Sequence, residues 1–317
     1  MSEPKPIIKW VGGKTQILSQ LFDKFPKEIH DYYEPFLGGG SVLFALLSKI
    51  KQGQIRLTGK IYASDLNDAL IHMYKNIQTR PQELYEQVQK YCDDYQRCAG
   101  VDVDRSPKLM NMVLIDNILR VSTMVSKETY YYWIRQKYNN LKPADKKSIA
   151  GSALLIFLNK TCFRGIYRVG PNGFNVPFGN YKSPEVINRE HLMEVSELIR
   201  PVVFECLDFE NSVPRALATA HPNTFIYMDP PYAPETTTSF VGYTGDGFPL
   251  EKHNKLFELC KLLNNKKIRF MMSNADVTLV TGNFDRHVYS IERILCRRTI
   301  NSKNPEARTN EVLIRNF

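Results

Sequence analysis

The chain has 317 residues, of which 43% are hydrophobic, enough for one large domain or two modest ones with a buried core. Its formal charge of +9 favours a polyanionic partner such as nucleic acid, although excess Lys and Arg is also compatible with solubility alone. No apolar run is long enough to span a bilayer, no secretory h-region follows Met1, and the cysteines and histidines lack metal-ligand spacing. We therefore expect a cytoplasmic protein with free thiols, no membrane segment and no metal.

The N-terminal segment 7–14 predicts a glycine turn that leads into a helix. Apolar residues at positions 17, 18, 21 and 22 follow Gly12-Gly13 with helical spacing. A phosphate-binding loop of the Walker type would require glycine at position 8, where the chain has Ile, so this spacing argues against a P-loop ATPase. Lys14 at the helix start suits a carboxylate ligand, and the alternative is an ordinary solvated lysine.

Two predicted strand ends then suggest a doubly wound sheet. The segment 32–41 is a strand followed by a glycine loop and a helix, but Gly38 and Gly40 do not complete the dinucleotide fingerprint. A nucleotide-like ligand without a pyrophosphate therefore fits better than NAD. The next strand, 60–65, ends in Asp65, which can accept both hydroxyls of a ribose or cap the following helix, a capping role also open to Asn67.

A mostly helical, polar stretch from 79 to 160 interrupts the strand and helix alternation and indicates an inserted subdomain. A predicted hairpin follows, with strands at 166–169 and 174–177 and a turn at 170–173. Arginine can read guanine edges and Ile166 or an aromatic ring can wedge between base pairs, so we expect DNA contact, with an ordinary basic surface hairpin as the alternative. The candidate DNA-contacting residues here are Lys160, Phe163, Arg164, Ile166, Arg168, Asn175 and Pro177.

The sheet resumes with a strand at 201–208, which leaves Asp208 and Phe209 at a strand end. They could line a pocket for the adenine of a cofactor, but Asp208 could equally cap the next helix. A helix is predicted at 250–263, with strands at 268–273, 287–295 and 311–317. The long loop 233–248 could contact substrate, and the basic loop before the last strand, with Arg297, Arg298 and Lys303, suits a phosphate backbone.

The segment 223–232 carries the strongest chemical signal. Phe225 to Met228 reads as a buried strand, and strand pairing must stop at Pro230-Pro231 because proline has no backbone N–H to donate. The Asp229 carboxylate and the Pro230 carbonyl could both accept hydrogens from an exocyclic amine, and Tyr232 could stack on a base removed from the duplex. Such a site suits methylation of adenine N6, and the alternative is a proline-rich turn.

Four motifs in order resemble the Dam-type family of DNA adenine-N6 methyltransferases, in its D12 class: 9–14, 34–41, 174–179 and 229–234. The resemblance implies a Rossmann-like α/β fold, a doubly wound mixed sheet with an inserted, mainly helical target-recognition subdomain that bears the hairpin. Residues 1–78 and 186–317 would form the catalytic domain and 79–185 the insertion.

The resemblance also implies S-adenosylmethionine as methyl donor. Trp10, Lys14, Asp65 and Asp229 match the family's cofactor-contacting positions, and Asp229, Pro230, Pro231 and Tyr232 its catalytic motif. The candidate cofactor residues together are Trp10, Lys14, Glu34, Pro35, Phe36, Gly38, Gly40, Asp65, Asp208, Phe209 and Asp229.

The implied substrate is double-stranded DNA, methylated at adenine within a short palindrome, most often GATC. We expect a monomer that needs no metal, and a restriction endonuclease acting separately is an open partner. The hairpin tip 170–173 and the insertion around 91–107 differ from the commonest family forms. Methylation of cytosine N4 or of RNA, and an inactive nucleic-acid-binding module, remain alternatives.

Overall fold

The computed structural model describes residues 4–98, 126–218, 221–234, 248–297 and 308–317, and of residues 297, 308 and 309 it describes only the backbone. The chain divides by its internal contacts into two compact units. Unit 1 comprises Met1–Gly13, Gly38–Phe44 and Asn67–Arg200, and unit 2 comprises Lys14–Leu37, Ala45–Leu66 and Pro201–Phe317.

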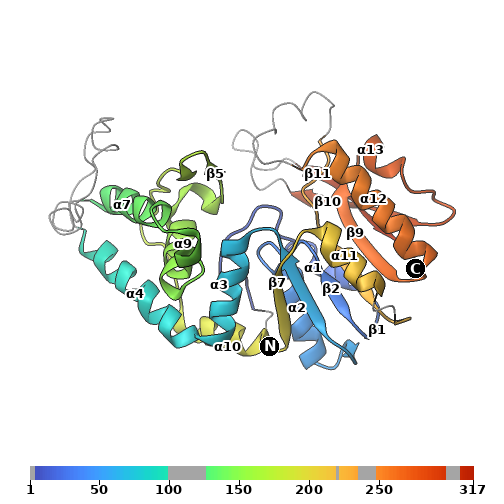
Figure 1. The fold of residues 1–317 in the computed structure, drawn as a ribbon, viewed down its shortest axis with the longest axis horizontal. Coiled ribbons are helices and arrows are strands. Elements are labelled where there is room, and N and C mark those ends of the chain that lie inside the picture. The colour runs from blue at the N-terminus through green and yellow to red at the C-terminus, as the bar shows by residue number, and fades with distance from the viewer. Residues whose placement is uncertain (1–3, 99–125, 219–220, 235–247, 298–307) are drawn as a thin grey trace. The chain divides into compact units, whose positions relative to one another are not determined.

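Figure 1 shows the fold and labels many of its helices and strands. The helices are α1 (Leu18–Phe22), α2 (Ser41–Lys51), α3 (Asp68–Thr79), α4 (Pro81–Arg97), α7 (Lys127–Asn139), α8 (Pro143–Lys146), α9 (Ile149–Thr161), the 3-10 turn η1 (Phe163–Gly165), α10 (Arg189–Leu198), α11 (Phe209–Ala218), α12 (Leu250–Asn265) and α13 (Thr278–Thr281). The strands are β1 (Glu28–Ile29), β2 (Tyr32–Glu34), β3 (Arg56–Leu57), β4 (Ile61–Asp65), β5 (Val169–Gly170), β6 (Gly173–Phe174), β7 (Val202–Cys206), β8 (Phe225–Met228), β9 (Arg269–Ala275), β10 (Ser290–Arg297) and β11 (Arg308–Arg315).

Unit 2 is built on a seven-stranded sheet with the order β10-β11-β9-β8-β2-β4-β7. The strands from β9 to β7 run parallel, whereas β11 is antiparallel to β9 and to β10. The order reverses at β2, because the chain continues to β4 on one side and later returns as β8 on the other. The predicted α/β fold, a doubly wound mixed sheet, is confirmed. Ligands of such sheets bind beyond the carboxyl ends of the strands at the reversal, here β2 and β8.

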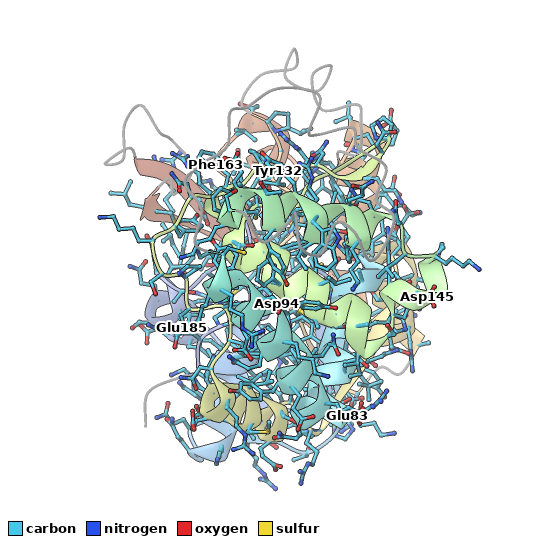
Figure 2. The ribbon with its side chains drawn as sticks, turned by 90° about the vertical axis from the view of Figure 1, so that its left-hand side faces the viewer. Glu83, Asp94, Tyr132, Asp145, Phe163 and Glu185 are labelled. Atoms are coloured by element: carbon cyan, nitrogen blue, oxygen red, sulfur yellow. The ribbon has the colours of Figure 1, made fainter. Side chains whose placement is uncertain are left out.

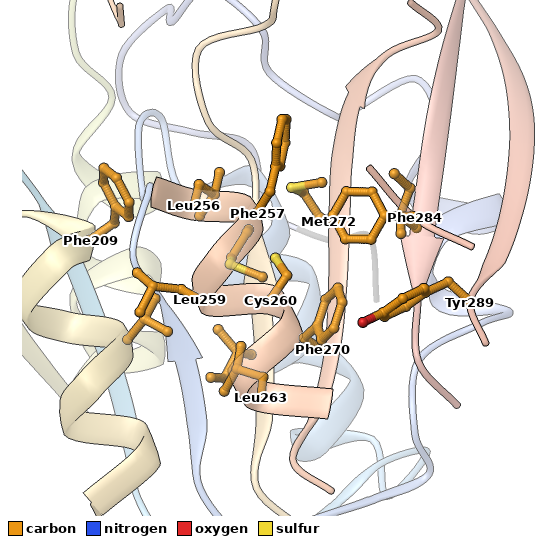
Figure 3. Packing of buried hydrophobic residues seen from close by; sticks show 14 of the residues in the cluster. Phe209, Leu256, Phe257, Leu259, Cys260, Leu263, Phe270, Met272, Phe284 and Tyr289 are labelled. Carbon is orange, nitrogen blue, oxygen red and sulfur yellow. The ribbon is translucent and has the colours of Figure 1, made fainter. Parts of the chain in front are cut away.

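The core of unit 2 explains why β8 reads as a continuous apolar run. All four β8 side chains are buried, and strand alternation sends them to opposite faces. Ile226 and Met228 pack in a cluster with α11, α12 and β9, part of which Figure 3 shows. Phe225 and Tyr227 contact the ring of Phe25, at 4.8 and 5.8 Å between centroids. Each such side chain contributes roughly 1.5–3 kcal/mol through burial, so β8 is held firmly up to the point where its prolines begin.

Unit 1 is mainly helical and centres on α9. Residues 151–158 of this helix are all buried, a pattern of a helix enclosed on every side. Helices α3, α4, α7 and α8 all contact it. Its N-terminus is capped by the Ser148 side chain, which accepts a hydrogen bond from Gly151 N at 3.2 Å.

The predicted elements are found, with differences at their ends. The hairpin pairs only β5 with β6, so its ladder is shorter than the predicted strands. Asn67, not Asp65, caps α3, because the Asn67 side chain accepts from Leu70 N at 3.1 Å. The cap proposed for Asp65 was therefore wrong. The short parallel pair β1–β3 was not predicted, because two-residue strands carry no periodicity.

In the described part of the chain, no helix combines the length and apolar character needed to cross a bilayer. Within the same residues, no group of three or more His, Cys, Asp and Glu side chains could hold a metal ion. All six cysteines are free thiols.

We predict that His253 makes unit 2 sensitive to acid. Its ring is fully buried beside Phe248 and Phe257, and burial lowers its pKa from 6.5 to about 4. Between pH 6.5 and 4, His253 therefore binds a proton in the unfolded chain but stays neutral in the folded chain. The free energy of unfolding that is present above pH 6.5 is lost as the pH falls toward 4. Urea unfolding should show wild type losing about 2 kcal/mol more than His253→Leu between pH 7.5 and pH 5. Equal losses in both proteins would contradict the prediction.

Candidate active site

The segment that follows β8 lies at the strand-order reversal of unit 2. β8 pairs with β2 on one side and with β9 on the other, and its hydrogen-bond ladder ends at Met228, one residue before Asp229 and the two prolines. Pro230 is buried, whereas 19% of the Asp229 side chain is exposed. The predicted acidic strand end is therefore present, at the edge where ligands of doubly wound sheets bind.

Asp229 forms an ion pair with Lys14. Lys14 Nζ lies 2.8 Å from Asp229 Oδ2, and the lysine side chain is only 4% exposed. The same ammonium lies over the ring of Tyr232, 4.9 Å from its centroid. The reading of Lys14 as a solvated lysine was wrong, because the structure brings three of the predicted site residues together.

The surroundings of Asp229 favour its protonated form more than those of a surface carboxylate. Burial raises the pKa of Asp229, the Lys14 ammonium opposes this rise, and the nearby carboxylate of Glu311 adds to it. The desolvation exceeds the effect of the ion pair, so the pKa of Asp229 remains above its ordinary value. The balance of burial, Lys14 and Glu311 therefore determines at which pH Asp229 loses its proton and becomes a charged acceptor.

Two residues that the sequence analysis did not select hold the segment after β8. Glu311 on β11 accepts a hydrogen bond from the Tyr232 hydroxyl at 2.7 Å. Asn274 on β9 is fully buried, and its Oδ1 accepts from Ala233 N at 3.1 Å. The only sequence signal for Glu311 or Asn274 was a polar residue within an apolar strand. This signal does not indicate which residue the side chain contacts.

An aromatic group lies at the carboxyl ends of β2 and β7. Phe36 and Phe209 are stacked with 5.4 Å between ring centroids, and Phe248 contacts both rings. Lys252 donates to the carboxylates of Asp208, at 2.9 Å, and Glu210, and it lies over the ring of Phe209.

Asp208 also performs the structural role that the sequence left open. Its carboxylate accepts from Glu210 N at 3.2 Å, and its backbone carbonyl accepts from Asn211 and Ser212 at the start of α11. The capping interpretation is therefore confirmed, and a cofactor contact remains a prediction beside it.

The remaining candidate cofactor residues of unit 2 end β2 and β4. Glu34 is buried and accepts a hydrogen bond from the Tyr32 hydroxyl at 2.6 Å, and Pro35 is buried beside it. Asp65 is partly exposed, ends β4 and pairs in register with Cys206 of β7. Carboxylates thus stand at or just beyond the ends of β2, β4, β7 and β8.

Trp10, Gly38 and Gly40 belong to unit 1. Gly38 has a φ of +50°, and a Cβ there would lie 2.8 Å from Trp10 Cδ1, so a side chain is excluded by both strain and space. The group that closely approaches Gly38 in this structure is the Trp10 indole, and the predicted approach of a ligand to the glycine loop stays a prediction. The Trp10 ring also stacks with the ring of Tyr167, with 5.5 Å between centroids.

The predicted hairpin is anchored by α7. Asn139 exchanges two hydrogen bonds with the backbone of Phe174, at 2.8 and 3.0 Å, and the Tyr131 hydroxyl donates to Val176 O at 2.7 Å. Figure 2 shows Phe163 and Tyr132 toward the top of the view and Glu83 toward the bottom.

The predicted DNA-contacting side chains of this region differ in exposure. Those that are exposed are Phe163, Arg164, Arg168, Asn175 and Pro177. Lys160 and Ile166 are half-buried, and desolvation lowers the pKa of Lys160. Arg168 Nε donates to Asn175 Oδ1 at 2.6 Å, so one guanidinium edge is committed within the hairpin. Arg298 and Lys303 lie outside the described residues, as does the Arg297 side chain.

The chain is similar to known proteins over nearly its whole length. Residues 10–99 and 109–300 match the family described as D12 class N6 adenine-specific DNA methyltransferase. The chain is 33% identical to the type II methyltransferase M.MjaIII of Methanocaldococcus jannaschii, over 99% of this chain and 100% of that protein. It is 28% identical to M1.LlaDCHI, a type II methyltransferase of Lactococcus lactis subsp. cremoris (99% and 95% covered), and 28% identical to the DNA adenine methylase of Haemophilus influenzae (96% and 90% covered).

We predict that Lys14→Met destabilises the protein by about 2 kcal/mol, because it leaves the Asp229 carboxylate desolvated without its counter-charge. Urea unfolding measures the loss, and Lys14→Met combined with Asp229→Asn should lose less than the two single changes together. Lys24→Met is the matched control, because Lys24 pairs with Glu292 at 3.0 Å in an exposed site where ion pairs contribute less than about 1 kcal/mol. Equal effects of the two lysine substitutions would contradict the prediction.

Proposed function

Because the chain belongs to the D12 class of N6 adenine-specific DNA methyltransferases, we propose that it transfers the methyl group of S-adenosylmethionine to N6 of an adenine flipped out of duplex DNA. The observation that carries the proposal is the Asp229 carboxylate, paired with Lys14, at the end of β8 and beside β2.

The amino group of adenine is a weak nucleophile, because its lone pair is delocalised into the ring. The Asp229 carboxylate and the Pro230 carbonyl accept its two hydrogens and favour a pyramidal nitrogen with its lone pair directed at the methyl carbon. The two prolines hold these acceptors in fixed positions. Catalysis therefore consists mainly of positioning the amine. Because the reactants have already lost their translational and rotational freedom on binding, that entropy cost no longer adds to the reaction barrier.

Tyr232 supplies an aromatic surface on which the extruded base stacks. Base–aromatic stacking contributes about 1–3 kcal/mol and partly offsets the cost of leaving the duplex. Lys14 near this ring and near Asp229 places a positive charge in the site, which opposes the rise that desolvation causes in the pKa of Asp229.

The residues of unit 2 fit S-adenosylmethionine by their chemistry. When bound, it supplies an electrophilic methyl group on a sulfonium. The stacked Phe36 and Phe209 offer apolar surface for an adenine. Asp65 suits the ribose hydroxyls, Asp208 the adenine amine, and the acidic edge formed with Glu34 and Asp229 suits a cationic ligand. The glycine segment offers no dinucleotide fingerprint, in agreement with a ligand that has no phosphate.

The hairpin of unit 1 is proposed to read the target sequence. Its anchoring on α7 fixes the backbone, while its exposed arginines suit guanine edges and phosphates. A GATC target is proposed from the family resemblance of the sequence motifs alone.

The test is methylation of unmethylated plasmid DNA by the purified protein, followed by mapping of N6-methyladenine at single-base resolution and nucleoside analysis. We predict N6-methyladenine within one short palindrome, and loss of all product in Asp229→Ala because an acceptor for the amine hydrogens is removed. Asp31→Ala is the matched control, since Asp31 precedes β2 at the opposite end of that strand and should leave the product unchanged. N4-methylcytosine as the product, or normal turnover by Asp229→Ala, would refute this assignment.

We also predict an acid limb in the single-turnover rate of methylation that reports Asp229 in the enzyme–DNA complex. Protonation makes the carboxyl group of Asp229 a weaker, uncharged acceptor, so activity falls as the pH drops through a pKa above that of an ordinary aspartate. Lys14→Met should move this limb to higher pH, because the charge that opposes desolvation is gone. Single-turnover rates across pH, measured on residual activity where necessary, check the shift, and an unchanged limb would count against Asp229 as the titrating group.

A further inference from the structure

We propose that Glu311 is a positioning residue for methyl transfer, which fixes the ring of Tyr232 by accepting the hydrogen bond from its hydroxyl at 2.7 Å. The inference rests on the proposed function and extends it to a residue beyond position 300, where the match to the family ends. Glu311 acts through Tyr232 and need not touch the base.

The sheet topology explains how a residue so near the C-terminus reaches this site. β11 runs antiparallel to β9, and Glu311 pairs in register with Ala275, the last residue of β9. The beginning of β11 therefore lies at the same sheet edge as the carboxyl ends of β8 and β9. The next residue of β11, Val312, pairs with Asn274, whose side chain holds Ala233 N.

Tyr232 is thus fixed from two sides. Asn274 holds the backbone of the residue that follows it, and Glu311 holds its hydroxyl. A ring tethered at its far end keeps a fixed plane, whereas a ring attached only by its Cβ can rotate about two bonds. A stacking surface of fixed orientation places the base amine relative to Asp229, and small misplacement is enough to slow a reaction that depends on positioning.

Glu311 also affects the charge of the site. The charged or titratable side chains that act on Asp229 are those of Lys14, Glu311 and Tyr232. Asp229 and Glu311 in turn both act on Tyr227, Tyr232 and Cys296, and the Cys296 thiol is hydrogen-bonded to Glu311. The carboxylate of Glu311 opposes ionisation of Asp229, so its neutral isostere should lower the pKa of Asp229. Glu311→Gln therefore separates the two effects, because glutamine keeps an acceptor oxygen but has no charge.

The experiment compares Glu311→Gln, Glu311→Leu, Tyr232→Phe and the double variant Glu311→Leu with Tyr232→Phe, in single-turnover methylation of duplex DNA. We expect Glu311→Leu and Tyr232→Phe each to lose about tenfold in rate. The double variant should be no more than about twofold slower than either, because both changes remove one shared bond. Glu311→Gln should stay within about threefold of wild type, with its acid limb moved to lower pH.

Glu292→Leu is the matched control. Glu292 lies on the neighbouring strand β10 and pairs with Arg315 and Lys24, so its loss should lower stability and leave the methylation rate unchanged. Additive losses in the double variant, a Gln variant as slow as Leu, or wild-type rate in Tyr232→Phe would each overturn the proposal. Tyr232→Phe and Glu311→Gln decide the matter even if Glu311→Leu does not fold. Absence of N6-methyladenine with wild-type protein would instead refute the proposed function itself.

Discussion

The ion pair between Lys14 and Asp229 is the interaction on which the candidate site depends. A carboxylate at the buried end of a parallel strand is strongly desolvated, and it stays available as an acceptor only if a counter-charge lies within contact distance. The lysine comes from the first residues of unit 2 and the aspartate from the end of β8, so the pair joins segments more than 200 residues apart. The proposed chemistry then needs only positioned acceptors and a stacking surface.

The sheet edge around this pair collects polar groups from strands of both directions. The parallel strands bring Glu34, Asp65 and Asp229 to one edge by their carboxyl ends, and the antiparallel β11 brings Glu311 there by its beginning. The edge is therefore acidic within a chain of net charge +9. An acidic edge suits a cationic ligand and an amine, whereas the positive charge elsewhere suits a polyanion. The proposed reaction needs an acidic site for the cofactor and the amine, and a basic surface for DNA. Different parts of the sequence provide these two properties.

Unit 1 holds a short hairpin in place. A two-stranded ladder of two residues each is not stable alone, and the hydrogen bonds from Asn139 and Tyr131 on α7 supply what the ladder lacks. The exposed side chains of the hairpin can then differ without loss of the fold. Such an arrangement agrees with the proposed role of the hairpin in target recognition, because loops held by a rigid support commonly carry binding residues.

The sequence by itself determined the strand ends, the glycine loop and the acidic motif at 229–232, because these depend on local rules of proline, glycine and periodicity. It also identified the family, since four motifs stood in the right order. The partner of Lys14, the tether of Tyr232 by Glu311, and the Trp10 indole against Gly38 were decided only by the tertiary structure. The physical reason is that these contacts depend on strand direction and register, which bring together residues that no local pattern relates.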